Sequence, residues 1–314
     1  MIKIALLNDT TRDAGHIGCK AVMHNLRLLC LNKNWEIIFT DADCHRLNKS
    51  DYSQKIQSAD IVILNGEGSL HNNQNTIWFE KMLLAKEAHK KCFLMNTIWQ
   101  ANELNKKYLE IFDVITVRES LSLRQITKDG AKNAVILPDL SFYSFGKIPE
   151  PDVSLKRNSL AIIDCTLKNT TNFLINYAFL HNYPLFFMYE KQFNKYARNI
   201  FYRMKYYFKE TSFYHLDCAE KLGWYEKIIS GRFHADCFAM MLGVPTLALS
   251  SNTWKTEGLY FDADLIDFYI SPQDNLIQKM NDFAENDSCA YWIPKAKNYA
   301  FNAQQKILKF YSSL

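Results

Sequence analysis

The 314-residue chain lacks the sequence signals of a membrane-spanning, secreted or disulfide-linked protein. No apolar run approaches the roughly 18 residues that a membrane span needs, and the N-terminus, MIKIALLND, is too short for the apolar region of a signal peptide. The eight cysteines are scattered and include no C-x-x-C pair, which is typical of reduced cytosolic thiols and predicts no structural metal. We therefore expect the protein to be made and kept in the cytoplasm.

Glycine and net charge are also scarce. Only 10 residues are glycine, and they form neither a dinucleotide fingerprint, G-x-G-x-x-G, nor a P-loop, G-x-x-x-x-G-K. The formal net charge of +4 suits an anionic substrate or a membrane surface but is far too small for a nucleic-acid-binding protein, so no nucleic acid partner is expected. With 48% hydrophobic and 22% charged residues, the composition is that of an ordinary soluble globular protein.

What the chain does contain is a regular alternation of short apolar runs and helical patterns, which predicts an α/β fold. The runs of the first half are IKIALLN, WEIIFTD, DIVILNG, KCFLMNT, DVITVRE and AVILPD, and those of the second half are LAIIDC, YPLFFMYE, FYHLD, KIISG, VPTLALS and LIDFYIS. Such alternation builds parallel sheets covered by helices on both faces. We expect two Rossmann-like doubly wound domains that face a cleft, with the loops after the strands around the ligand.

The boundary between the two domains is predicted near the middle of the chain. The apolar pattern stops at SFGKIPEPDVSLKRN, residues 144–158, where prolines and charges cluster as they do in linkers. A chain of this length also exceeds the usual size of a single core. We place an N-terminal domain at residues 1–145, a linker at 146–157 and a C-terminal domain, ending in a helix, at 158–314.

The stretch NGEGSLH follows the apolar run IVIL and carries the first candidate chemistry. Gly66 and Gly68 lie where the strand must turn and where a backbone can approach a ligand closely, so Glu67 is expected at the mouth of the cleft. Taken alone, the pattern fits a tight turn with Ser69 as a helix N-cap equally well.

The stretch KIISGRFHADCFAMMLGVPTLALS, residues 227–250, is the second informative one. It predicts a strand, a turn at Gly231, a helix that begins near Arg232, and a return into another strand. Because the N-terminus of a helix favours anions, Arg232 and His234 are candidates for an anion site. The alternative is an arginine that pairs with a local carboxylate, next to a half-buried histidine.

Further candidates follow other predicted strands. Arg118 opens a helix after VITV, where it either contacts an anion or forms a salt bridge with Glu119 or another neighbour. Asp139 lies at a strand end in LPDLSF, and Lys255 lies in the loop after TLALS. His16 follows the first strand, also at the expected cleft.

The tract FFMYEKQFNKYARNIFYRMKYYFK, residues 186–209, interleaves aromatic and basic side chains. Such a tract suits a polyanionic or lipid-linked acceptor and implies peripheral contact with the inner face of a membrane. More often it is an amphipathic helix with a solvated basic face. The sequence leaves both interpretations open.

The elements NGEGSLH, VRES, LPDLSF and SGRFHADCFAMMLGVPTLAL occur in this order, and with them the chain resembles the polysaccharide pyruvyl transferase family. The opening HIGCKAVMHNL fits that family as well. The resemblance spans about Lys3 to Leu259, and its most specific part is Ser230 to Ala235. It implies a GT-B-like pair of domains and the transfer of a pyruvyl group from phosphoenolpyruvate to a sugar, as a ketal, in the assembly of bacterial exopolysaccharide or lipopolysaccharide. No cofactor besides the donor is implied.

The resemblance implies roles for the candidate residues. Phosphoenolpyruvate carries a phosphate and a carboxylate, for which Arg118 and Arg232 are the candidate ligands, and Lys255 matches by position a lysine of the family that we assign to the donor phosphate. Forming the ketal needs a proton donor, for which the imidazole of His234 is suited. Glu67 would accept a proton from the attacking hydroxyl.

The remaining candidates are expected to shape the loops or position the reactants: Gly66, Gly68, Ser69, His71 and His16. The acceptor, a sugar or a lipid-linked oligosaccharide, is expected on the N-terminal domain, near Asn8, Asp9, His16 and Asn72. The donor is expected on the C-terminal domain.

Two other functions fit the same pattern. One is a GT-B glycosyltransferase that uses a nucleotide-activated sugar, such as 3-deoxy-manno-octulosonic acid linked to cytidine monophosphate. In that enzyme Glu67 would be a general acid or base, Asp139 the nucleophile, and the arginines would bind the donor. The other is a non-catalytic, glycan-binding member of the fold.

Overall fold

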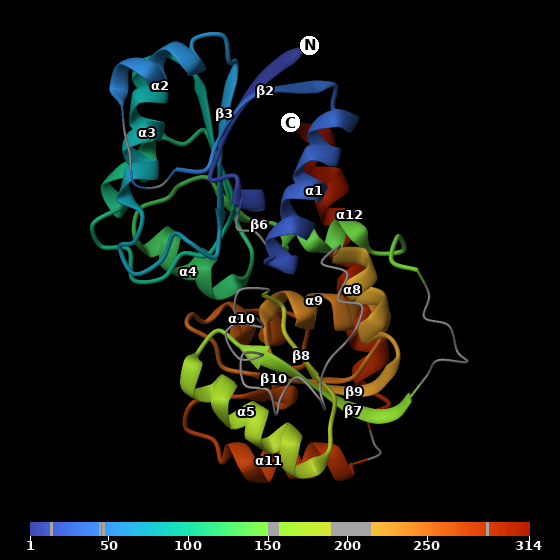
Figure 1. Ribbon diagram of the computed structural model, residues 1–314. Helices are drawn as coiled ribbons and strands as arrows, with labels where there is room; N and C mark the ends of the chain where they lie inside the picture. Colours follow the sequence, from blue (N-terminus) through green and yellow to red (C-terminus); the bar gives the residue numbers. More distant parts are fainter. Residues whose placement is uncertain (13–14, 44, 46–47, 150–156, 190–214, 287–288) are drawn as a thin grey trace. The chain divides into compact units, whose positions relative to one another are not determined.

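The computed structural model describes residues 1–12, 15–43, 45, 48–149, 157–189, 215–286 and 289–314 (Figure 1). The chain forms two compact units, and each contains segments from distant parts of the sequence. Unit 1 consists of Met1–Arg12, Val22–Leu140 and Lys306–Leu314, and unit 2 consists of Asp13–Ala21 and Ser141–Gln305.

Unit 1 is built on a six-stranded parallel sheet with the strand order β2-β1-β3-β4-β5-β6. The strands are β1 (Ile2–Leu7), β2 (Trp35–Asp41), β3 (Ile61–Glu67), β4 (Lys91–Thr97), β5 (Val114–Val117) and β6 (Ala134–Ile136). The central strand β3 is buried along its whole length, as expected of a parallel sheet with helices on both faces. All six strands predicted in the first half of the chain are confirmed.

Helices cover this sheet and carry its aromatic core. They are α1 (Ile17–Asn32), which begins in unit 2, α2 (Lys49–Ile56), α3 (Thr76–Glu87) and α4 (Ser120–Lys128), with short 3-10 helices at Thr10–Arg12 and Lys106–Ile111. Phe79 of α3 meets the rings of Trp99 and Phe112 edge-on, with centroids 6.0 and 6.2 Å away. Burial of such rings stabilises the unit.

Unit 2 is built on a second parallel sheet, of five strands in the order β11-β10-β9-β7-β8. The strands are β7 (Arg157–Cys165), β8 (Leu185–Phe186), β9 (Tyr225–Gly231), β10 (Thr246–Leu249) and β11 (Tyr269–Ile270). The helices are α5 (Lys168–His181), α8 (His215–Leu222), α9 (Phe233–Leu242), α10 (Lys255–Asp262), α11 (Leu276–Glu285) and α12 (Trp292–Ser313), with 3-10 helices at Leu140–Ser144 and Ile266–Phe268.

One predicted strand of the second half, FYHLD, is wrong. From His215 onwards the chain forms the helix α8, and residues 213 and 214 lie outside the described part. Ala219 and Leu222 are three residues apart and are both fully buried, so the apolar positions recur with the period of a helix. The run was interpreted as a strand because it begins with aromatic residues, which are common in strands. The other five strands predicted in this half are confirmed.

The two sheets share one topology. When the strands of each unit are numbered in chain order, both sheets read 2-1-3-4-5, with a sixth strand added in unit 1. This is a doubly wound order, so the predicted pair of Rossmann-like units is confirmed. Its strand order reverses between β1 and β3 in unit 1 and between β7 and β9 in unit 2, and ligands bind such sheets at these switch points. A cleft shared by the two units stays a prediction.

Each compact unit includes segments from both halves of the sequence, so a division at a single linker does not reproduce the two units. Residues 13–21 belong to unit 2, although the sequence around them belongs to unit 1. The last helix, α12, runs from unit 2 into unit 1 at Lys306. The main division falls between Leu140 and Ser141, and most of the predicted linker lies outside the described residues.

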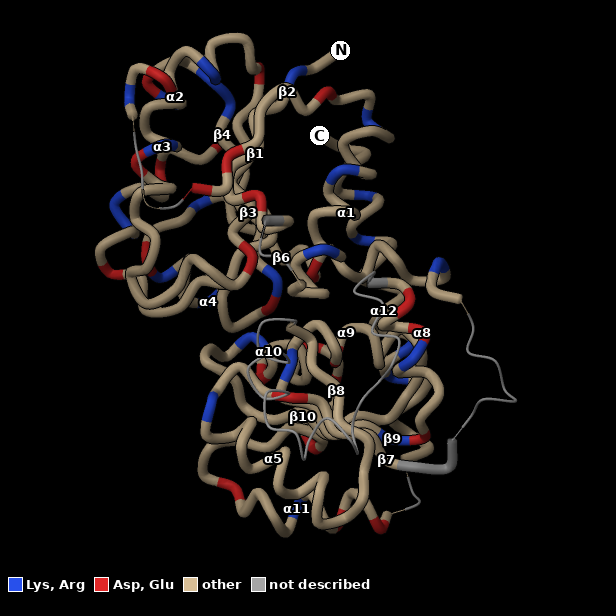
Figure 2. Tube along the Cα trace, in the orientation of Figure 1, with Lys and Arg blue, Asp and Glu red and all other residues tan. Residues whose placement is uncertain are grey.

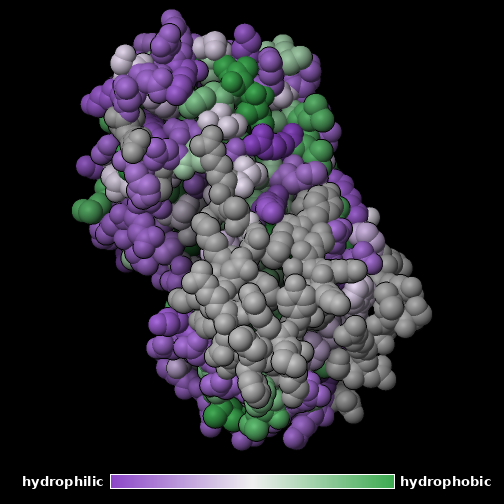
Figure 3. Space-filling model, in the orientation of Figure 1, coloured by the Kyte–Doolittle hydropathy of each residue, from purple (hydrophilic) through white to green (hydrophobic). Residues whose placement is uncertain are grey.

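Charged residues of both signs are spread over both units (Figure 2), and hydrophilic residues predominate over α2 and α3 on the face shown in Figure 3. The tract of aromatic and basic residues at 186–209 lies outside the described part from residue 190 onwards. Among the helices of the described residues, none is both long enough and apolar enough to cross a membrane.

Candidate functional site

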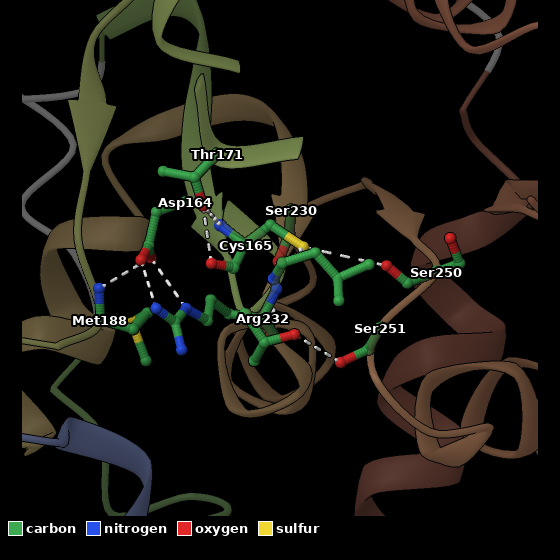
Figure 4. Close-up of polar contacts among 10 residues, drawn as sticks. Asp164, Cys165, Thr171, Met188, Ser230, Arg232, Ser250 and Ser251 are labelled. Atoms are coloured by element: carbon green, nitrogen blue, oxygen red, sulfur yellow. Dashed lines mark hydrogen bonds and ion pairs between the residues drawn. The ribbon is translucent and has the colours of Figure 1, made fainter. Parts of the chain in front are cut away.

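A buried ion pair joins the ends of β7 and β9 at the switch point of unit 2 (Figure 4). The carboxylate of Asp164, fully buried near the end of β7, accepts hydrogen bonds from Nε of Arg232 at 3.0 Å and from its Nη2. The same carboxylate accepts the backbone N–H of Met188 at 3.0 Å. This fork of bonds fixes the plane of the guanidinium. The pairing considered as the alternative for this stretch is therefore present, with Asp164 as an unpredicted partner.

The sequence Ser-Gly-Arg sets the position of Arg232. A Cβ atom on Gly231 would lie 2.4 Å from Cβ of Cys165, so only glycine lets the end of β9 approach β7 this closely. The hydroxyl of Ser230 accepts the backbone N–H of Arg232 at 3.1 Å. Arg232 is thereby held as the residue immediately before α9, where the helix N-terminus favours anions.

Two imidazoles lie at this point. His234, in the first turn of α9, is buried, and the ring of His16 meets it edge-on with centroids 6.0 Å apart. A Cβ atom on Gly18 would lie 1.9 Å from Nδ1 of His234, so the glycine lets the start of α1 pack against this ring. The prediction had grouped His16 with the loops of the N-terminal domain, whereas the structure places it in unit 2 beside His234.

The charges around His16 are mainly positive. Burial, followed by the positive charges of His234, Arg232 and Lys255, lowers the pKa of His16 well below its ordinary value. Its Nδ1 lies 3.2 Å from the backbone N–H of Cys19, which donates to it. His16 is therefore a neutral imidazole at neutral pH.

Lys255 completes the basic group as the first residue of α10. Its side chain is half-buried, and Nζ donates to Oδ1 of Asn252 at 3.3 Å. The helices α1, α9 and α10 thus begin beside basic residues: His16 and Arg232 immediately precede theirs, and Lys255 opens its own. Unpaired backbone N–H groups at helix starts add to the positive potential. We call His16, Arg232, His234 and Lys255 the basic cluster.

A buried carboxyl group that the sequence analysis missed lies on α9. Burial raises the pKa of Asp236 well above its ordinary value, against the opposing effects of the nearby Ser230 side chain and the charge of Lys255. The carboxyl group is therefore neutral over a wider range of pH than an exposed one. Its position inside the apolar run DCFAMML was the only sequence signal for it.

The switch point of unit 1 carries a different set of groups, gathered around Glu67. Nδ2 of Asn8 donates to the carbonyl oxygen of Asn65 at 2.6 Å and to Oγ of Ser69 at 2.8 Å. Glu67 accepts from Oγ1 of Thr10 at 2.7 Å and from Nδ2 of Asn65 at 3.3 Å. It is only 4% exposed, and its φ of 37° is a strained left-handed conformation for this residue. The carboxylate is thus held by neutral donors.

The neighbours of Glu67 serve the loop in different ways. A Cβ atom on Gly66 would lie 2.3 Å from the side chain of Thr97 on β4, so this glycine is required by the packing of two strands. That reason differs from the predicted approach to a ligand. Gly68 is half-buried in the following turn, and buried His71 lies with its Nδ1 3.0 Å from Nδ2 of Asn72.

Arg118 and Asp139, predicted for separate roles, bind each other in unit 1. Nη1 of Arg118 lies 2.6 Å from Oδ2 of Asp139, and the two side chains are 1% and 0% exposed. Glu119 instead accepts the backbone N–H of Ser122 at 2.9 Å and caps α4. Arg118 and Asp139 thus belong to one unit, and Arg232, His234 and Lys255 to the other.

The described residues offer no group of three or more His, Cys, Asp or Glu side chains that would hold a metal ion. Seven cysteines within the described part are buried and form no disulfide bond there: Cys19, Cys30, Cys92, Cys165, Cys218, Cys237 and Cys289.

Comparison with known proteins gives a family and a fold. A family model described as polysaccharide pyruvyl transferase matches residues 16–253, whereas no curated protein matches the chain. The solved UDP-N-acetylglucosamine 2-epimerase of Rickettsia bellii is similar, with a TM-score of 0.62 and 16% identity over 100% of this chain and 96% of that one. The S. aureus MnaA-UDP co-structure has a TM-score of 0.64 and 13% identity over 98% and 95%.

A functionally uncharacterised protein from Klebsiella pneumoniae is also similar, with a TM-score of 0.53 and 16% identity over 86% of this chain and 93% of that one. Identities at this level show a shared fold alone, which is GT-B-like.

Proposed function

Because this chain belongs to the polysaccharide pyruvyl transferase family, we propose that it transfers a pyruvyl group from phosphoenolpyruvate to two hydroxyl groups of a sugar, forming a ketal. The observation that carries the proposal is the basic cluster at the switch point of unit 2. The proposed acceptor is a sugar of a bacterial surface polysaccharide, free or lipid-linked. Since phosphoenolpyruvate is a cytoplasmic metabolite, the proposed site of action is the cytoplasm.

The basic cluster suits a small donor with both a carboxylate and a phosphate. Asp164 offsets the charge of Arg232 and orients its guanidinium, so Arg232 contributes geometry as much as charge. Lys255 and the starts of three helices supply further positive potential. We assign the donor to this cluster.

The proposed reaction balances without a cofactor. His234 donates a proton to the terminal carbon of the enol, which becomes a methyl group. Two hydroxyl oxygens of the sugar form bonds to the adjacent carbon, while its bond to the phosphate oxygen breaks. One hydroxyl proton restores His234, and the other leaves with inorganic phosphate. We propose Glu67 as the base that accepts this second proton from the attacking hydroxyl and passes it on to the departing phosphate.

The surroundings of Asp139 argue against the double displacement considered for a glycosyltransferase. A carboxylate nucleophile must reach the anomeric carbon of its donor. The side chain of Asp139 is 0% exposed and is bound to Arg118. We therefore do not assign it a catalytic role, and nucleotide binding becomes an outcome of the test below.

Thermal stabilisation of the purified protein tests the donor without knowledge of the acceptor. Phosphoenolpyruvate is expected to raise the melting temperature, because a ligand at 100 times its Kd stabilises the native state by about 2.7 kcal/mol. The rise should disappear in Arg232→Ala and persist in the control Lys279→Ala, whose charge lies on α11 in a partly exposed pair with Asp274. Cytidine monophosphate, uridine diphosphate and inorganic phosphate are compared in parallel.

Two results would contradict the proposal. Stabilisation by a nucleotide but not by phosphoenolpyruvate would assign a nucleotide-sugar donor. Binding of a glycan by a protein that binds neither phosphoenolpyruvate nor any of the nucleotides would assign a non-catalytic member of the fold.

A further inference from the structure

The two nitrogens of the His16 ring have different surroundings. Nδ1 accepts the backbone N–H of Cys19 at 3.2 Å, which satisfies one of the unpaired donors at the start of α1. A neutral imidazole that accepts at Nδ1 carries its proton on Nε2. Within the described part of the chain, no hydrogen-bond partner occupies Nε2. The ring therefore presents a single N–H donor away from its own helix.

Two other rings lie close to the ring of His16. Its centroid lies 6.0 Å from that of His234, at an interplanar angle of 82°, and 5.6 Å from that of Tyr189. The absence of a side chain on Gly18 lets α1 begin directly against His234. Packing against these neighbours thus holds His16 beside the proposed proton donor.

Hydrogen bonds connect the backbone next to His16 to the buried ion pair of Asp164 and Arg232. Ile17 N–H donates to the carbonyl oxygen of Met188 at 3.1 Å, and Met188 N–H donates to Asp164, which binds Arg232. The segment that carries His16 and the guanidinium of Arg232 are therefore positioned by one continuous set of hydrogen bonds. A site built in this way is pre-organised for a ligand.

Charge separates the roles of the two imidazoles. The groups that face His16 are His234 and Arg232 of the α9 start, Lys255 of α10 and the ring of Tyr189. A second positive charge among them is unfavourable, so His16 stays neutral when His234 is protonated. A neutral Nε2–H donates a hydrogen bond without delivering its proton.

We propose that His16 binds the donor substrate through its Nε2–H, which an oxygen of the donor's carboxylate or phosphate accepts, while His234 alone delivers the proton. The proposal rests on the proposed function and adds to it a binding residue from the N-terminal part of the chain.

Two variants of His16 separate its two nitrogens. In His16→Asn the side-chain oxygen lies near the position of Nδ1 and keeps the cap, since asparagine is a favoured N-cap, but the distal N–H is lost. In His16→Gln the amide reaches towards the position of Nε2, and the cap is lost. We expect His16→Asn to keep the melting temperature and to weaken phosphoenolpyruvate binding about 10- to 100-fold, the usual effect of losing a hydrogen bond to a charged group.

His16→Gln is expected to melt at a lower temperature but to bind phosphoenolpyruvate several-fold more tightly than His16→Asn. Wild-type affinity in His16→Asn would overturn the proposal. If the wild-type protein itself fails to bind phosphoenolpyruvate, the proposed function fails and this inference fails with it. If the wild type and His16→Asn bind phosphoenolpyruvate equally well, only this inference fails.

A measurement on the wild-type protein does not depend on the folding of any variant. With 15N-labelled histidine, NMR is expected to show His16 as the Nε2–H tautomer and to show its Nε2 signal shifting when phosphoenolpyruvate is added. Inorganic phosphate serves as the comparison for the phosphate group alone. An Nδ1–H tautomer, or an Nε2 signal whose chemical shift does not change when phosphoenolpyruvate is added, would contradict the assignment of His16 to the donor site.

Discussion

The two units have the same strand order, but different side chains occupy the point at which that order reverses. In unit 1 the hydroxyl of Thr10 and the amide of Asn65 donate hydrogen bonds to the carboxylate of Glu67. In unit 2 Arg232 and His234 stand at the equivalent place, beside Lys255. A shared backbone thus sets where ligands are expected, and the residues after the strands set which ligand chemistry is favoured.

The same contrast holds for the two buried ion pairs. Arg118 and Asp139 follow β5 and β6 of unit 1, away from its switch point. Arg232 and Asp164 lie at the switch point of unit 2. Pairs of the same chemistry should therefore support the fold in one unit and both the fold and the site in the other.

The largest effect is expected from the proton donor of unit 2. His234→Gln should lower kcat by about 100- to 10,000-fold, the usual range for the loss of a general acid, while phosphoenolpyruvate still binds. His181→Gln, on the exposed end of α5, is the matched control and should leave turnover unchanged. Steady-state release of inorganic phosphate measures both. A fully active His234→Gln protein would move the proton donor elsewhere.

The next effect sharpens the contrast between the ion pairs. Asp164→Ala leaves Arg232 buried without its counter-charge and should lower the free energy of unfolding by about 3–5 kcal/mol, as measured with a chemical denaturant. Asp139→Ala should lower it similarly through Arg118. Only Asp164→Ala is expected to lose stabilisation by phosphoenolpyruvate as well.

An exposed pair provides the control for these variants. Asp51 and Lys55 are 50% and 48% exposed, so Asp51→Ala should change the free energy of unfolding by less than about 1 kcal/mol. Equal stability of Asp51→Ala and Asp164→Ala would show that the buried pair in unit 2 does not support the fold.

A third prediction concerns the carboxylate of unit 1. Glu67→Gln should lower kcat by about 100-fold, because an amide does not accept the hydroxyl proton, without weakening phosphoenolpyruvate binding. The fold should be kept, since the glutamine oxygen still accepts from Thr10. Glu110→Gln, exposed in the same unit, is the control. Unchanged turnover in Glu67→Gln would remove Glu67 from the mechanism and leave its network a structural one.

Two glycines extend the comparison. Gly66→Ala presses a methyl group against Thr97 and should lower the free energy of unfolding by about 1–3 kcal/mol. Gly18→Ala presses instead on the ring of His234, so it should lower turnover in assays of phosphate release. If Gly66→Ala impaired turnover and spared stability, the glycine would serve the ligand, as the sequence interpretation had it.

The smallest effect, counted per unit of pH, is expected in the pH dependence of the free energy of unfolding. Burial raises the pKa of Asp236 above its ordinary value of 3.8, so the folded state keeps a proton that the unfolded chain releases. The wild type therefore loses stability as the pH rises above that ordinary value, by at most about 1.4 kcal/mol per pH unit. Asp236→Asn has no such proton and should gain on the wild type from pH 5 to pH 8 in denaturant unfolding. Asp282→Asn, exposed on α11, should show no gain.

The apolar runs of the sequence are enough to predict the two sheets and the edge at which each candidate site lies. Apolar runs mark buried strands, and parallel strands end at one edge, so the sequence places Glu67 and Arg232 at the ends of β3 and β9 without knowledge of the packing. The run FYHLD failed because a few aromatic residues suit a buried helix as well as a strand.

The pairs of residues that contact each other became evident only from the folded chain. Asp164 is 68 residues from Arg232, Asp139 is 21 from Arg118, and His16 meets His234 across most of the chain. A local pattern reports the burial and periodicity of a segment, but it carries no information about the segment that packs against it. Such contacts form only when the sheets assemble, because the strand order then brings together strand ends that lie far apart in the sequence.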